Sequence, residues 1–173
     1  MTSPRILSHS FSERSWSLLL QLGNIVLNTR SKDIILTNFC LGKHLMGEND
    51  LLKDQRGSPA YISPEVLSGK PYQGKPSDMW ALGVVLFTML YGQFPFYDAV
   101  PHELFSQIKG AQYTFHNEVR VSEDTKGIVA KLLVVQPQAR LTATELRAEL
   151  EEVIMAWRAM IPPPPRDAQK VDT

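Results

Sequence analysis

Residues 79 to 90, M-W-A-L-G-V-V-L-F-T-M-L, form the most apolar stretch of the chain. Apolar side chains occupy every face of a helix over this run, so it predicts a helix buried on all sides rather than an amphipathic surface helix. The run is shorter than the roughly 18 residues needed to cross a bilayer. Because a fully buried helix needs a shell of other elements around it, the run predicts a globular domain.

Helix boundary signals frame this central helix and predict further helices after it. Ser77 can cap its start, and Gly92 and Pro95 can end it. Three more helix starts follow, at Pro101, at Ser122, and at the T-x-x-E capping box formed by Thr142 and Glu145.

The last of these helices carries an apolar stripe from Leu146 to Met160. We expect the stripe to pack in the core. Its end, with Met155, Trp157 and Met160, would be exposed if a neighbouring element is absent.

The region before the central helix has little helical pattern. Two short apolar runs at 25–27 and 34–36 are separated by a polar turn, which predicts a β-hairpin. Residues 43–60 are polar and irregular and predict a long loop, and residues 1–16 show no periodicity. The fold class we expect is therefore mainly α.

Charge and cysteine content narrow the class of partner and the compartment. Lys and Arg together number 18, as do Asp and Glu, so the formal net charge is zero and we expect neither nucleic acid nor a membrane as the main partner. Cys40 is the single cysteine, which favours a reducing compartment. The four histidines show no metal-binding spacing. We expect the protein in the cytoplasm, the nucleus or both.

Six short motifs occur in a fixed order along the chain. They are N-I-V-L-N at 24–28, T-N-F-C at 37–40, G-S-P-A-Y-I-S-P-E at 57–65, S-D-M-W-A-L-G at 77–83, Y-G-Q-F-P-F at 91–96 and Q-P-Q-A-R-L-T at 136–142. This set resembles the C-terminal lobe of the eukaryotic protein kinase fold, from its catalytic-loop asparagine to its last helix. Within that family, the chain resembles the Tribbles-related pseudokinase group.

The resemblance implies a partial kinase C-lobe, which is a helical bundle around a buried central helix with a short β-hairpin. Only 16 residues precede Ser17, so we expect no N-terminal lobe. The domain organisation we expect is a divergent, disordered lead-in at 1–19, a partial kinase-like C-lobe at 20–160, and a Pro-rich disordered tail at 161–173.

The resemblance also places the residues that a kinase uses for phosphoryl transfer, a reaction that depends on positioning and on charge neutralisation around Mg·ATP. Asn38 takes the place of the metal-binding aspartate, followed by Cys40 in place of a glycine, and Asn24 matches the metal-binding asparagine. Leu19 occupies the position of the base aspartate, five residues before Asn24. An amide is a poorer ligand than a carboxylate for a hard dication, and leucine cannot accept a proton. We therefore expect no catalytic residue, no cofactor site and no bound Mg·ATP, with Asn24 and Asn38 as degenerate metal positions.

Three residues match structural positions of the family. Glu65 resembles the glutamate of the A-P-E motif and Arg140 its arginine partner, so the resemblance implies a buried ion pair between them. Asp78 resembles the aspartate at the start of the central helix that holds the catalytic loop.

The resemblance places Ser58, Tyr61 and Ser63 in the activation segment, where active kinases hold a peptide substrate. Ser58-Pro59 and Ser63-Pro64 also match the pattern of proline-directed phosphorylation sites. We favour a packing role for both segments.

Three functions follow as hypotheses. The first is a catalytically inactive scaffold in signalling regulation, whose partners would be signalling proteins or substrates brought to a ubiquitin ligase. The final residues contain no segment like the ligase-binding tail of the Tribbles group, so substrate docking on the helical lobe is the part of this role that we expect. The second is a serine/threonine protein kinase that binds ATP and phosphorylates proteins. The third is a truncated isoform without independent function.

Overall fold

The computed structural model describes residues 15–17, 20–38, 42–45, 47, 50–55 and 57–160. The helices of this part are α1 (Pro64–Leu67), α2 (Gly74–Tyr91), α3 (Pro101–Lys109), α4 (Glu123–Leu132) and α5 (Ala143–Met160). The strands form three antiparallel pairs, which are β1 (Ser15–Ser17) with β4 (Lys43–Leu45), β2 (Ile25–Leu27) with β3 (Ile34–Leu36), and β5 (Leu51–Leu52) with β6 (Tyr72–Gln73). The mainly α fold class is confirmed.

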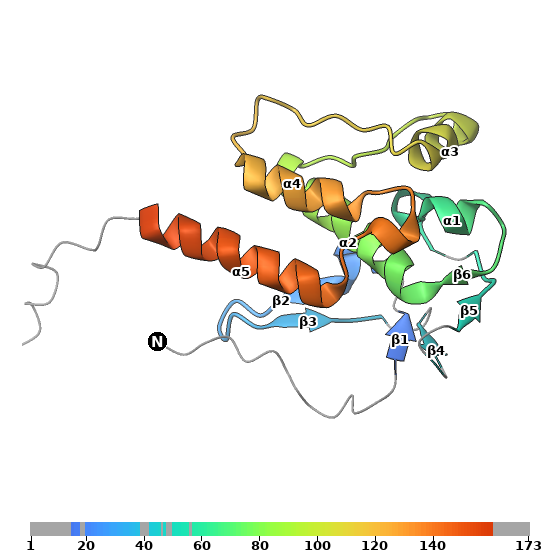
Figure 1. Ribbon diagram of the computed structural model, residues 1–173, viewed down its shortest axis with the longest axis horizontal. Coiled ribbons are helices and arrows are strands. Elements are labelled where there is room, and N and C mark those ends of the chain that lie inside the picture. The colour runs from blue at the N-terminus through green and yellow to red at the C-terminus, as the bar shows by residue number, and fades with distance from the viewer. Residues whose placement is uncertain are drawn as a thin grey trace, which may run out of the picture.

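Helix α2 is the central helix that the apolar run predicts. Trp80, Val84 and Phe87 are among its completely buried side chains. Helix α4 packs against it, and β1 and the short turn at Pro59–Tyr61 contact it as well. Figure 1 shows α2 enclosed between the strands on one side and α4 on the other.

The predicted end of α2 is confirmed, but its predicted start is wrong. The helix ends at Gly92, which has a left-handed φ of 72° and donates its N–H to the Thr88 carbonyl at 2.9 Å. It begins at Gly74, with Gln73 rather than Ser77 at the cap position. Pro76 fits the first helical turn, because that turn needs no backbone donor there. Ser77 lies inside the helix and turns its hydroxyl toward Ser63 at 2.9 Å.

The loop predicted at 43–60 contains more regular structure than its composition indicates. Strands β4 and β5 lie within it, and β4 pairs with β1, which begins in the region without periodicity. Strand β5 pairs with β6, which begins 20 positions after β5 ends, and Leu51 lies opposite Gln73. Strands of two or three residues are too short to show a period of their own. Whether they form depends on pairing partners that are distant in sequence.

The other predicted elements are confirmed. The β2–β3 hairpin forms with Val26 opposite Ile35, and α3 begins at Pro101. The hydroxyl of Ser122 accepts the Thr125 N–H at 3.2 Å and so caps α4.

Helix α5 begins with the predicted capping box. A carboxylate oxygen of Glu145 accepts the Thr142 N–H at 2.8 Å, and the Thr142 hydroxyl accepts the Glu145 N–H at 3.3 Å. The first half of the α5 stripe packs in the core as expected, with Leu146 buried and Leu150 and Val153 partly buried against the same cluster. The second half does not, since Trp157 is 62% exposed and Met160 is 79% exposed. No helix in the described part of the chain is both long and apolar enough to cross a membrane.

Helices α2 and α4 pack closely at Gly83. A Cβ at this position would lie 2.9 Å from the Cβ of Leu132 and from a methyl carbon of Leu133. Gly83→Ala should therefore destabilise the fold, because an overpacking penalty of about 1–3 kcal/mol exceeds a helix-propensity gain of about 0.5–1 kcal/mol.

Gly127 in α4 is the matched control for Gly83, because a Cβ there would meet nothing within 4 Å. Gly127→Ala should gain about 0.5–1 kcal/mol in unfolding free energy, which urea denaturation can measure. Equal effects of the two substitutions would show that α2 and α4 are not in close contact at Gly83.

The capping box of α5 predicts a pH-dependent stability. Hydrogen bonds from the backbone N–H and the hydroxyl of Thr142 lower the pKa of Glu145. A carboxylate with a lowered folded-state pKa stabilises the fold above its unfolded-state pKa, and this stabilisation is lost as the pH falls through the folded-state value. The melting temperature of the protein should therefore exceed that of Glu145→Gln at neutral pH, and the gap should close below about pH 4. A gap of the same size in acid would contradict the charged contact.

Candidate functional site

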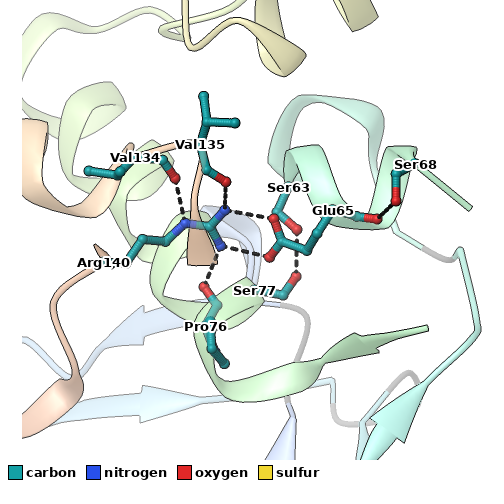
Figure 2. A network of polar contacts seen from close by, with 8 residues as sticks. All are labelled: Ser63, Glu65, Ser68, Pro76, Ser77, Val134, Val135 and Arg140. Atoms are coloured by element: carbon teal, nitrogen blue, oxygen red, sulfur yellow. Dashed lines mark hydrogen bonds and ion pairs between the residues drawn. The ribbon is translucent and has the colours of Figure 1, made fainter. Parts of the chain in front are cut away.

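The best-defined polar site is an ion pair between Arg140 and Glu65 (Figure 2). Two guanidinium nitrogens of Arg140 donate to the two carboxylate oxygens of Glu65, Nη1 to Oε1 at 2.7 Å and Nη2 to Oε2 at 2.6 Å. The Arg140 side chain has no exposed surface, and that of Glu65 is 14% exposed. The predicted partners therefore meet, and they meet with the two-pronged geometry of the strongest arginine–carboxylate pairs.

Every N–H donor of the Arg140 guanidinium has a partner. Besides the two bonds to Glu65, it donates to the carbonyls of Pro76 at 2.9 Å, Val134 at 2.7 Å and Val135 at 3.1 Å. Its guanidinium carbon also lies 5.0 Å from the ring centroid of Trp80. A guanidinium has five donors, so the charge is buried at a position where its hydrogen-bonding capacity is fully used.

Three elements hold the ion pair in place. Glu65 is in the first turn of α1, and Arg140 follows the short turn Pro137–Ala139 that leads from α4 to α5. Near the pair, the buried hydroxyls of Ser63 and Ser77 lie 2.9 Å apart and connect the start of α1 to α2. The site therefore fixes the end of the expected activation segment to the helical base.

Asn24 and Asn38 lie side by side at the end of the β2–β3 hairpin. Thr37 donates its N–H to the Asn24 carbonyl at 2.8 Å, and the side-chain amide of Asn38 donates to the side-chain oxygen of Asn24 at 3.4 Å. Asn38 has a left-handed φ of 60°, which asparagine adopts more readily than most residues. Leu19 and Cys40 lie outside the described residues.

The paired amides of Asn24 and Asn38 differ from the ligands that Mg²⁺ prefers. Both ligand positions carry neutral side chains, and Mg²⁺ prefers carboxylates and phosphates around a near-ideal octahedron. Within the described ranges, no group of three or more His, Cys, Asp or Glu side chains is placed to hold a metal ion. Asn24 keeps the residue type that the resemblance assigns to its position, whereas Asn38 replaces a carboxylate, so the pair offers Mg²⁺ amide oxygens without negative charge.

The expected activation segment packs against the chain that precedes the hairpin. The Tyr61 hydroxyl accepts the Leu22 N–H at 3.4 Å, and the Tyr61 ring meets Phe94 edge-on at 5.5 Å. Ser58 and Asp78 line a pocket of about 10 Å³ beside these residues, which has room for little more than one water molecule. Ser58 itself is exposed, whereas Ser63 is completely buried, so of the two Ser-Pro sequences only Ser58-Pro59 is accessible as folded.

Sequence reasoning missed several contacts around this site. Gln55 donates to the Val66 carbonyl at 2.8 Å, and the Tyr72 hydroxyl donates to the Asp54 carbonyl at 2.8 Å. Burial raises the pKa of Tyr72, and the carboxylates of Asp54, Asp78 and Glu65 act in the same direction, so the phenol stays a neutral donor. The partners are 11 and 18 residues apart in sequence, and no local pattern could have indicated them.

Comparison with known proteins places this architecture in a family. The family described as "Protein kinase domain" matches residues 20–150. The chain is 67% identical to serine/threonine-protein kinase 40 of Gallus gallus and 64% identical to that of Homo sapiens, each over 141 residues that make up 82% of this chain and 32% of the relative. It is 38% identical to Tribbles homolog 1 of Homo sapiens over 129 residues, 73% of this chain and 34% of the relative.

The chain thus spans about a third of the length of these curated relatives. The matched range contains the hairpin amides, the Glu65–Arg140 pair and the central helix α2. The chain belongs to the protein kinase domain family.

Proposed function

We propose that this chain is a catalytically inactive kinase-like module that regulates intracellular signalling by binding other proteins. The observation that carries this proposal is the contact between Asn24 and Asn38, whose neutral amides face each other at the positions that resemble the two metal-binding positions of a kinase. A dication that neutralises phosphate charge needs negative ligands of its own, and this pair supplies none.

The intact helical base supports the binding part of the proposal. The buried Glu65–Arg140 pair and the core around α2 give a rigid framework, and a rigid surface loses little conformational entropy on binding a partner. The frame of the family is present, while Asn38 stands where the resemblance expects the metal-binding aspartate.

The partners we propose are signalling proteins, or substrates delivered to a ubiquitin ligase, in the cytoplasm or the nucleus. This part rests on the resemblance to the Tribbles-related group and on the zero formal charge, which does not favour nucleic acid or a membrane.

A thermal-shift titration of the purified chain with Mg·ATP tests the loss of nucleotide binding. We expect no saturable rise of the melting temperature, because a ligand stabilises the fold only through its affinity for the folded state. The double variant Asn24→Ala/Asn38→Ala shows where any binding occurs. A saturable shift in the parent chain that disappears in this variant would contradict the proposal, whereas an equal shift in both would place the nucleotide elsewhere.

A serine/threonine protein kinase is the second candidate. Membership of the family and the names of the relatives favour it. It predicts transfer of phosphate to protein substrates, which the inactive module does not.

A chain without independent function is the third candidate, favoured by the exposed hairpin. Five apolar side chains of the hairpin are 37–67% exposed, namely Val26, Leu27, Ile34, Ile35 and Leu36. Contiguous apolar exposure favours aggregation or a covering partner. Size-exclusion chromatography and urea unfolding of the 173-residue chain test this third candidate. A monomer that unfolds cooperatively would rule it out.

A further inference from the structure

An open groove of about 530 Å³ lies between α4 and α5, away from the Glu65–Arg140 site. Gly127 and Ile128 of α4 and Val153 and Ala156 of α5 form its apolar lining. A Cβ on Gly127 would meet no atom within 4 Å, so the groove is open above the α4 backbone. Small residues on both helices let another backbone approach closely.

The apolar surface continues beyond the groove because α5 is longer than α4. With 18 residues against 10, α5 extends about 27 Å and α4 about 15 Å. Figure 1 shows the last turns of α5, in red, projecting past the start of α4. Val153, Ala156, Trp157 and Met160 follow at spacings of three and four, so they share one face, and Trp157 and Met160 are largely exposed.

Charges around the groove are predominantly negative. Its charged lining residues are Glu123, Asp124, Glu149, Glu152 and Lys131. Lys126 contacts Glu123 at 2.7 Å and Lys131 contacts Glu149 at 2.7 Å. Asp124 and Glu152 form no ion pair with any residue that the structure describes. Two carboxylates thus remain available to a cation from outside.

This charge pattern decides among the classes of partner. Nucleic acid and anionic membranes carry phosphates, which the carboxylates repel. A second copy joined by a two-fold axis would set this predominantly negative surface against an identical one, since such an interface uses the same patch on both copies. A basic protein segment satisfies both the carboxylates and the apolar face.

We propose that the α4–α5 groove binds a basic amphipathic helix from a partner protein. Its apolar stripe would pack over Gly127, Ala156 and Trp157, and its Lys and Arg side chains would reach Asp124 and Glu152. The face from Glu149 to Met160 is about 18 Å long, which matches a helix of about 12 residues. This assignment rests on the proposed role as a protein-interaction module and names a surface and a partner chemistry for it.

Selection from a displayed peptide library tests the assignment. The peptides have about 16 residues, with leucine fixed at helical spacing and every other position drawn from Lys, Glu, Gln and Ala. Selection on the 173-residue chain should enrich Lys over Glu. The affinity of the enriched peptides should fall about tenfold or more for Asp124→Lys/Glu152→Lys and for Gly127→Trp, and it should weaken as salt is raised.

Glu118→Lys/Glu151→Lys is the matched control, with the same change in net charge outside the groove lining. It should bind the peptides like the parent chain, and circular dichroism melts should show that all variants remain folded. No enrichment, enrichment of Glu, or equal binding by the groove variants would overturn the assignment. A dimer that Gly127→Trp dissociates in sedimentation analysis would overturn it in favour of a second copy.

Failure of this assignment and failure of the proposed function give different results. Peptides that bind equally well to the groove variants would contradict the groove and leave a protein-binding module. Phosphate transfer from Mg·ATP would contradict the inactive module, whatever the peptides do.

Discussion

Arg140→Met should lower the free energy of unfolding by about 3–5 kcal/mol, because removing one partner of a buried ion pair leaves the other charge uncompensated. The Glu65 carboxylate would lose both of its guanidinium contacts, and the carbonyls of Pro76, Val134 and Val135 would lose their donors. Urea denaturation followed by circular dichroism measures the loss. The free energy of unfolding of a typical domain is only about 5–15 kcal/mol, so this variant would be close to unfolding.

Two further variants separate the buried pair from arginine replacement in general. Arg147→Met removes an exposed partner of Glu151 on α5 and should cost at most about 0.5 kcal/mol. Arg140→Met/Glu65→Leu should be more stable than the sum of the single losses predicts, because no charge is left unpaired. A loss below about 1 kcal/mol for Arg140→Met would show that the pair does not hold the fold together.

Trp80→Ala should lower the free energy of unfolding by about 3–5 kcal/mol, as large-to-small changes of aromatic core residues do. Trp80 is completely buried on α2, stacks on Phe96 with ring centroids 5.4 Å apart, and lies beneath the Arg140 guanidinium. Its removal would open a cavity at the point where the core meets the ion pair. The unfolding free energy from urea denaturation tests this.

Trp157→Ala is the matched control for Trp80, since it removes the same side chain from a position that is 62% exposed. It should cost less than about 1 kcal/mol. Trp80→Phe should lower the unfolding free energy less than Trp80→Ala does. The buried indole N–H makes no hydrogen bond with any described residue, so the change to phenylalanine removes only side-chain volume. Equal losses for Trp80→Ala and Trp157→Ala would contradict the assignment of α2 as the central core helix.

Local patterns predicted those parts of the fold whose causes are local. The fully apolar run gave α2, the Gly92 signal gave its end, and the capping residues at Ser122 and Thr142 gave the starts of α4 and α5. The predicted start of α2 was wrong because the Ser77 hydroxyl pairs with the Ser63 hydroxyl, 14 residues away, instead of capping the helix. Strands β1, β4, β5 and β6 were missed because they are too short to show alternation and depend on distant partners.

The site was predictable only through family resemblance. Glu65 and Arg140 are 75 residues apart, so no spacing argument could have paired them, whereas the ordered motifs did. The amide contact between Asn24 and Asn38 had no signal in the pattern of either strand, because it arises where the hairpin ends meet. The groove between α4 and α5 depends on two helices of unequal length, and that difference becomes visible only when they are packed together.

Transfer of radiolabelled phosphate from Mg·[γ-³²P]ATP tests the central claim most directly. The purified 173-residue chain is incubated with general protein substrates, casein and myelin basic protein, beside Asn24→Ala/Asn38→Ala as the matched variant. We predict incorporation no greater than in the reaction without the chain, both into the substrates and into the chain itself. Incorporation that grows with time in the parent chain and is lost in the variant would contradict an inactive module.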